Sequence, residues 1–363
     1  MKNFLMSIVN VNDPPNGNTQ IHPYSINKRG HLHKQQIAIA RDYYKLKPPS
    51  TSERFDRIKD LYPLDALSKK IVVLIGLGGS RQFAEDLARS GVVNFALFDG
   101  DTVSRANIAT QHVYSSEVGR NKAEVIKERI LDINPLVRVT VVPRFLNESM
   151  TDNDFMYIIG KSIIATPEDV LICGCTDNFY AQARSAALAL KFGTPYIAAQ
   201  LYRGGMAAEI YFSYPGATNN SCPRCAMRNR YEAYANGYKS DVTSAGTPIF
   251  ATTRVNSLKG QIALMLLLYK EDKNCIYSNM LDQVADRNFV MIRMSPLAGS
   301  SLNINIFNEA LCEKSGLTYF DETVWIPQAP SDGTDGHDVC PLCNGTGDLL
   351  ALKGRIADTR TDW

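Results

Sequence analysis

Apolar runs that end in glycine or polar residues alternate with amphipathic stretches between about residues 70 and 200. The first run, at 69–79, reads KKIVVLIGLGG; unbroken β-branched runs are typical of parallel strands covered on both faces. Helical patterns follow the apolar runs, and the predicted helices cover 83–91, 121–135 and 179–193, with further strands at 94–101, 137–143, 169–178 and 194–200. Strands alternating with helices predict an α/β fold of Rossmann type, a doubly wound and mostly parallel sheet that binds ligands at the carboxyl ends of its strands.

The pattern changes outside this region. Residues 1–50 contain DPPNGN and KPPS, which favour loops or a mobile arm, and a helical stretch is expected at about 52–68. A late apolar helix is predicted at 257–272, and the tail beyond it mixes loops with candidate strands at 288–294, 302–307 and 323–327. We therefore expect an N-terminal arm at 1–50, a central α/β domain at 51–270 and a mixed C-terminal extension at 271–363.

The composition argues against only a few classes of function. The chain has 39 basic and 37 acidic residues, so its balance gives no reason to expect binding to nucleic acid. No apolar stretch is long enough to span a bilayer, and the first residues lack the pattern of a signal peptide. We expect a cytoplasmic protein that does not associate with membranes.

The first strand leads into a glycine turn formed by Gly76, Gly78 and Gly79. Glycines between a strand and a helix let the backbone approach a phosphate or ribose, although Arg81 stands where a third glycine would complete the motif. Asp99, at the end of the second strand, has the spacing of a ribose-binding acid in a Rossmann unit. A tight turn without a ligand and a turn-capping aspartate are the alternatives, so these two features alone indicate a nucleotide site only weakly.

Two CxxC pairs suggest a metal centre. Cys222 and Cys225 form the first pair, and Cys340 and Cys343 form the second. Four thiolates can complete a closed tetrahedral zinc site, which has a structural role because no coordination position is left open. One such pair alone would be ambiguous with redox chemistry, whereas two predict zinc. Cys173 and Cys175 lie on or beside an apolar strand and are expected in the core.

Five segments, in order along the chain, are more informative about function than the glycine turn. They are Arg54 to Arg57 before the first strand, Asp99 and Asp101 after the second, Ala106 to Gln111, Val118 to Lys122, and Cys175 to Asn178. Together they resemble the ThiF/MoeB superfamily of adenylating enzymes, which includes the activating enzymes of ubiquitin-like proteins. The resemblance covers about residues 54–270 and the C-terminal CxxC.

The resemblance implies that ATP and a C-terminal carboxylate react to form an acyl-adenylate and pyrophosphate. Positioning and charge neutralisation would carry such a reaction, because the carboxylate is already nucleophilic. The resemblance implies that Lys122 and Asn107 contact phosphates, that Asp177 holds Mg²⁺ and that Asp99 binds the ribose. The cofactors would be ATP, Mg²⁺ and Zn²⁺, and the complete set of expected nucleotide-binding residues is Gly76, Gly78, Gly79, Asp99, Asp101, Asn107, Gln111, Lys122, Asp177 and Asn178.

The same resemblance implies that Arg57 is an arginine finger, which in bacterial relatives reaches across a homodimer. The partner of the whole chain would be a small ubiquitin-like or sulfur-carrier protein, or a ribosomal peptide, that presents its C-terminus to the site. A downstream conjugating enzyme is a further candidate partner. For Lys122 a solvated helix residue, and for Asp177 a turn former, are the alternatives.

The sequence also departs from the family. Thr110 replaces an arginine that contacts phosphates in relatives, and Arg105, Arg81 or His112 could compensate. Val242 stands where relatives that form a thioester or persulfide carry a cysteine. The enzyme could therefore release the acyl-adenylate to another molecule, use the distant Cys275 or Cys312, or transfer the acyl group to Thr243 or Ser244, whose hydroxyls lack an obvious base.

Two other classes of function remain open at this level. An NAD-dependent oxidoreductase would share the glycine turn and Asp99 but has no use for Asn107, Lys122 and Asp177. A catalytically inactive nucleotide-binding scaffold would keep the fold and the zinc, and Thr110 and the altered glycine turn give it some support.

Overall fold

The structure is a computed structural model that describes residues 6–8, 22–26, 32–34, 51–160, 166–218, 220–238, 246–298, 322–334 and 336–362. The chain divides into two compact units, Met1–Asp56 and Arg57–Trp363.

The first unit contains a small antiparallel sheet in the order β1-β2-β3. Its elements are β1 (Met6–Ile8), β2 (His22–Ile26), β3 (Leu32–Lys34) and the short helix α1 (Thr51–Phe55). The prediction of an irregular arm was wrong at these strands. They have only three to five residues each, too few for an alternating pattern to stand out among the surrounding prolines and glycines.

The second unit is built on one eight-stranded sheet in the order β11-β10-β9-β8-β7-β4-β5-β6. The strands from β6 to β8 in this order are parallel, whereas β9, β10 and β11 continue the sheet antiparallel. The bounds are β4 (Ile71–Ile75), β5 (Asn94–Phe98), β6 (Arg138–Val142), β7 (Val170–Gly174), β8 (Tyr196–Leu201), β9 (Ala207–Ser213), β10 (Phe289–Arg293) and β11 (Glu322–Ile326). This arrangement confirms the predicted α/β fold.

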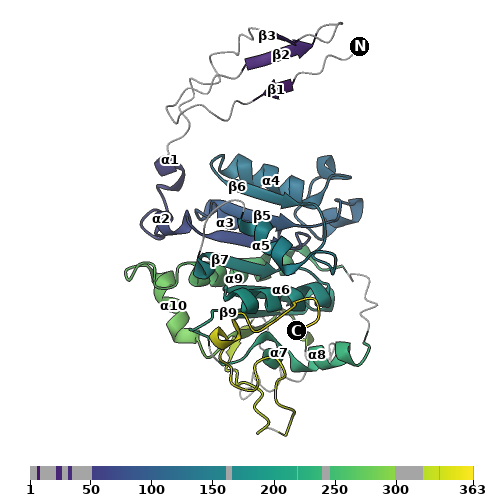
Figure 1. Cartoon of the computed structure of the whole chain (residues 1–363), viewed down its shortest axis with the longest axis vertical. Helices are drawn as coiled ribbons and strands as arrows, with labels where there is room; N and C mark the ends of the chain where they lie inside the picture. The colour runs from purple at the N-terminus through teal and green to yellow at the C-terminus, as the bar shows by residue number, and fades with distance from the viewer. Residues whose placement is uncertain are drawn as a thin grey trace. The chain divides into compact units, whose positions relative to one another are not determined.

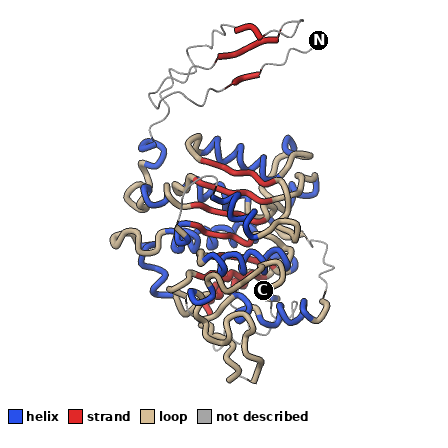
Figure 2. The backbone as a smooth tube through the Cα atoms, viewed as in Figure 1, coloured by secondary structure: helices blue, strands red, loops and turns tan. Residues whose placement is uncertain are grey.

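Helices cover both faces of the sheet (Figure 1), and the strands lie between them (Figure 2). Side chains of β4 alternate: Val72 and Leu74 belong to one apolar cluster, while Ile71, Val73 and Ile75 belong to the other. The first cluster includes residues of α3 (Arg81–Arg89), α4 (Lys122–Ile133) and α9 (Ile249–Leu267), and the second includes residues of α5 (Asp152–Gly160), α6 (Phe179–Phe192) and α8 (Arg228–Ala235). A strand buried on both faces explains the unbroken apolar run in the sequence.

Several helices differ from the prediction. The stretch at 52–68 is not one helix but α1 and α2 (Leu64–Leu67), which are separated by turns at 56–62. Pro63, which has no N–H to continue a helix, takes the N-cap position of α2. The late helix α9 begins at Ile249, directly after Pro248, rather than at Ser257. Helices α5, α8 and α10 (Ile276–Val284) were not predicted, and the candidate strand at 302–307 lies outside the described residues. No helix of the described ranges could cross a membrane.

Candidate nucleotide site and metal centre

The glycine turn lies between the carboxyl ends of β5 and β7. The Gly76 amide donates to the Phe98 carbonyl at 2.9 Å, and the Cys175 amide donates to the Ile75 carbonyl at 2.8 Å. Gly76 has a φ of +89°, and a Cβ added there would lie 2.8 Å from the Cys175 oxygen. Only glycine fits at this position. The turn therefore brings the ends of three neighbouring strands together.

Asp99 is fixed on one side of this turn. Its carboxylate accepts hydrogen bonds from the Leu77 amide at 2.7 Å and from the Asp101 amide at 2.8 Å. Burial raises the pKa of Asp99, and these two backbone hydrogen bonds oppose the effect because they stabilise the charged form. The carboxylate thus joins the first turn residues to the end of β5, in the place expected of a ribose acceptor.

Lys122 is the first residue of α4 and is buried, with 7% of its surface exposed. Its ammonium lies 2.9 Å from the Asp101 carboxylate, and its amide donates to the Asp101 carbonyl at 2.9 Å. Asn121 caps α4 and also donates to the carbonyls of Asp99 and Asp101, both at 3.1 Å. These contacts hold the lysine close to Asp99, at the edge where the turn lies.

Between Asp101 and Lys122 the chain forms the 3₁₀ helix η1 (Arg105–Ala109). The side-chain oxygen of Asn107 accepts from the Ser104 amide at 2.9 Å as part of a capping box, which leaves its side-chain amide nitrogen for other contacts. Gln111 approaches the glycine turn: a Cβ added to Gly78 would lie 3.0 Å from its side-chain nitrogen. Its side-chain oxygen is buried and has no hydrogen-bond partner among the described residues.

Asp177 follows β7 on the other side of the turn. Its side chain is exposed, and it directly precedes Asn178, the N-cap of α6, whose side chain accepts from the Ala181 amide at 2.9 Å. Since β7, β4 and β5 are adjacent in the sheet, Asp177 and Asp99 lie at its same edge, on either side of the glycine turn. An exposed carboxylate beside this glycine turn is chemically suited to Mg²⁺.

The other residues predicted for the reaction lie away from these contacts or outside the described residues. Arg57 is exposed at the start of the second unit. Thr243 and Ser244, the candidate acyl acceptors, lie outside the described residues, as does Cys312. Cys275 is buried and its thiol donates to the Leu61 carbonyl at 3.4 Å, so it is covered by the fold.

Helix α9 also reaches the glycine turn, which sequence reasoning missed. Asn256 donates to the Gly79 carbonyl at 2.6 Å, and the Lys259 ammonium donates to the Ser80 hydroxyl at 2.7 Å. Thr252 lies on the same side of the helix, 3.4 Å from a Cβ added to Gly79. The signal was available, since polar residues at 252, 256 and 259 have the spacing of one helical face in a buried helix.

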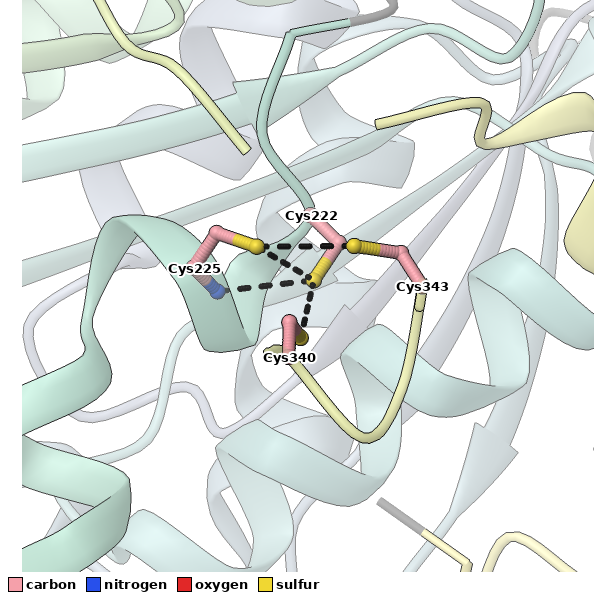
Figure 3. Close-up of side chains that lie close together, drawn as sticks. All are labelled: Cys222, Cys225, Cys340 and Cys343. Carbon is pink, nitrogen blue, oxygen red and sulfur yellow. Dashed lines mark hydrogen bonds between the residues drawn. The ribbon is translucent and has the colours of Figure 1, made fainter. Parts of the chain in front are cut away.

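The four cysteines of the CxxC pairs converge (Figure 3). All four sulfur atoms lie within 4.8 Å of one another, with separations of 3.5 Å from Cys222 to Cys225, 3.6 Å from Cys222 to Cys340 and 3.5 Å from Cys225 to Cys343. A disulfide would need ~2.05 Å. Tetrahedral zinc with ~2.3 Å Zn–S bonds places its sulfurs ~3.8 Å apart, so the donor set and its spacing fit a closed zinc centre.

The chain is similar to known proteins over its central part. The ThiF family model matches residues 52–294. A tRNA threonylcarbamoyladenosine dehydratase of Bacillus subtilis (strain 168) is 40% identical over 105 residues, 28% of this chain and 41% of the relative. A molybdopterin-synthase adenylyltransferase of Escherichia coli (strain K12) is 30% identical over 167 residues, 45% of this chain and 61% of the relative. This chain therefore spans about half the length of these two relatives.

A solved structure is also similar. The crystal structure of E. coli MccB with MccA-N7isoASN has a TM-score of 0.50 to this chain at 16% sequence identity. The match covers 76% of this chain and 73% of the other. At this identity the likeness concerns the fold.

Proposed function

The chain belongs to the ThiF family, and from this membership we propose that it is an ATP-dependent adenylyltransferase acting on a C-terminal carboxylate. The acceptor of the adenylyl group would be a small ubiquitin-like or sulfur-carrier protein, or a ribosomal peptide. One carboxylate oxygen attacks the α-phosphorus of ATP, the bond to the β-phosphate oxygen breaks, and pyrophosphate leaves with the electron pair. The product is an acyl-adenylate.

The observation that carries this proposal is the convergence of Asp99, Lys122 and Asp177 around one glycine turn. Asp99 is pre-oriented by two backbone amides and can accept hydrogen bonds from ribose hydroxyls. Lys122 supplies a positive charge for the phosphates, and it would exchange part of its interaction with Asp101 for them. No strong base is required, because the attacking group is already ionised at neutral pH.

Two metal ions fit the residues present. Asp177 would hold Mg²⁺, which neutralises charge on the phosphates when bound. The four cysteines would hold Zn²⁺ in a structural site that joins the tail of the chain to the segment after β9. An NAD-dependent reaction has no use for an exposed carboxylate and a lysine placed in this way, and a scaffold that has lost activity needs neither.

The fate of the acyl-adenylate and the assembly of the enzyme complete the proposal. Cys275 is buried, so we favour release of the adenylate to a further molecule over transfer to that thiol. Transfer to Thr243 or Ser244 for conjugation is the alternative. We also propose a cytoplasmic homodimer in which Arg57 acts on the neighbouring active site, consistent with its exposure.

Exchange of labelled pyrophosphate into ATP tests the proposal. The full chain is incubated with Mg²⁺, ATP and small proteins or peptides that end in Gly-Gly, and each is compared with the same molecule carrying a C-terminal amide. We expect exchange with the free carboxylate only, because an amide cannot attack phosphorus in this way. Equal exchange with both forms, or binding of NAD in place of ATP, would show that the chain has another activity.

A further inference from the structure

Arg81 is an unusual residue for the position it occupies. It is the first residue of α3, separated from the glycine turn by Ser80 alone, and its side chain has no exposed surface. None of its three guanidinium nitrogens has a hydrogen-bond partner among the described residues. Burial lowers the pKa of Arg81 to about 10, with Glu117 acting in the opposite direction, so the side chain is still charged at neutral pH.

The acidic residues whose charges act on Arg81 have other partners. Arg129 lies 3.0 Å from the Glu85 carboxylate and 2.7 Å from the Glu117 carboxylate, so it pairs with both. The two oxygens of Asp99 accept backbone hydrogen bonds from the turn and from the end of β5. These carboxylates therefore interact electrostatically with Arg81, but Arg81 forms no ion pair with any described residue.

Lys259 is a second buried cation at the same turn, with 2% of its surface exposed. Its ammonium contacts the Ser80 hydroxyl, lies 3.6 Å from the Cys175 sulfur and sits 4.2 Å from the centre of the Phe83 ring. These contacts are neutral, and Lys259 has no carboxylate within ion-pair distance in the described part of the chain. Two buried basic side chains thus lie beside the glycine turn, and neither forms an ion pair with a described residue.

We propose that Arg81 and Lys259 hold positive charge beneath the glycine turn for the phosphates of the bound nucleotide, in place of a cation at residue 110. This inference rests on the proposed function, since it assigns a role within the same ATP site. Residue 110 is a threonine and cannot carry charge. Because Arg81 is fully covered, it acts on the phosphates through its electric field rather than by direct contact, as a positioning residue.

The physical reason is the low dielectric around these groups. Burying a cation without an ion-pair partner is unfavourable in free energy. A phosphate group that binds nearby stabilises the cation and offsets part of this free energy. Charges act over longer distances where water is excluded, so a guanidinium behind the turn still attracts the phosphates in front of it. Adenosine, which has no phosphates, gains nothing from this arrangement.

Calorimetric titration with ATP and with adenosine tests the inference, with the full chain and Mg²⁺ present. Arg81→Met removes the charge and keeps much of the side-chain volume. We expect it to weaken ATP binding about tenfold or more while adenosine binding changes less than twofold. Arg81→Lys should restore most of the ATP affinity, and Lys259→Met should weaken ATP in the same selective way. Arg89→Met, at the exposed end of the same helix, is the matched control and should bind both ligands as the unmodified chain does.

The outcomes separate this inference from the proposed function. Failure of the unmodified chain to bind ATP contradicts both. Normal ATP binding by the unmodified chain, with equal losses for ATP and adenosine in Arg81→Met, would show a purely structural role and overturn only the present inference. If Arg81→Met does not fold, the Lys259→Met and Arg81→Lys titrations decide, and an unchanged ratio of ATP to adenosine affinity in Lys259→Met rules the inference out.

Discussion

The cysteine cluster leads to a quantitative prediction about stability. Cys340→Ser removes one of the four sulfurs that link the tail of the chain to the segment after β9. A zinc ion at this site closes a long loop, since Cys222 and Cys340 are 118 residues apart in sequence. Losing a sulfur ligand should release the metal and leave the loop open.

The size of the effect follows from the length of this loop. Closing a loop of this length removes chain entropy from the unfolded state that corresponds to about 5 kcal/mol at 25 °C. The cluster is also surrounded by buried Leu349, Leu352 and Ile356, which would lose packing if the tail detached. We therefore expect Cys340→Ser to lower the free energy of unfolding by about 3–5 kcal/mol and the melting temperature by roughly 10 °C.

Elemental analysis for zinc and differential scanning calorimetry on the same samples test this prediction. The unmodified chain should contain one zinc per chain, and Cys340→Ser should contain much less. Cys275→Ser is the matched control, because Cys275 is buried but lies outside the cluster. A Cys340→Ser protein that keeps its zinc, or that melts at the same temperature as the unmodified chain, would show that the four cysteines do not form a structural zinc site.

Three further predictions concern the site and the C-terminal tail. Asp177→Ala should reduce pyrophosphate exchange by about a hundredfold or more without changing the melting temperature, because the side chain is exposed; retained exchange would remove its assigned role. Arg57→Ala and Lys122→Ala proteins should each be nearly inactive, yet an equimolar mixture should recover about a quarter of the normal turnover if the arginine acts across the dimer, because about half of the dimers are then mixed and each mixed dimer has one intact site. Burial acts to raise the pKa of Asp152, but hydrogen bonds from Lys191 and from the tail outweigh it and lower the pKa below its usual value. The ionised Asp152 carboxylate therefore stabilises the folded chain at pH values above its unfolded pKa of about 3.9, and this contribution is lost as the pH falls through its pKa in the folded chain. Asp152→Asn should make the free energy of unfolding, measured with denaturant, fall less steeply as the pH is lowered.

The central sheet could be predicted from the sequence because its strands are covered on both faces. That environment produces unbroken apolar runs such as IVVLI, followed by helices whose stop signals are local, as at Asn134 and Gly193. The small sheet of the first unit could not be predicted, because strands of three residues carry no usable periodicity. Helix α5, with Asp152, Asn153 and Asp154 in its first turn, was missed because its polar start resembles a loop.

The candidate site shows the same division between local and long-range information. Asp99, Lys122 and Asp177 follow strand ends or begin a helix, so their order in the chain already predicts that they meet at one edge of the sheet. The contacts of Asn256 and Lys259 with the turn depend on how α9 packs against residues about 180 positions earlier. The polar residues at 252, 256 and 259 indicate one face of a helix, but their spacing does not identify the distant segment that this face contacts.

The path of one oxygen atom shows whether the carboxylate itself attacks ATP. A protein or peptide substrate is prepared with ¹⁸O in its C-terminal carboxylate and incubated with the full chain, Mg²⁺ and ATP, and the AMP that forms is analysed by mass spectrometry. Attack of the carboxylate on the α-phosphorus, followed by cleavage at the acyl carbon, transfers one labelled oxygen to each AMP. We predict AMP that carries one ¹⁸O. Unlabelled AMP would mean that water attacks the nucleotide, and it would contradict adenylation of the carboxylate.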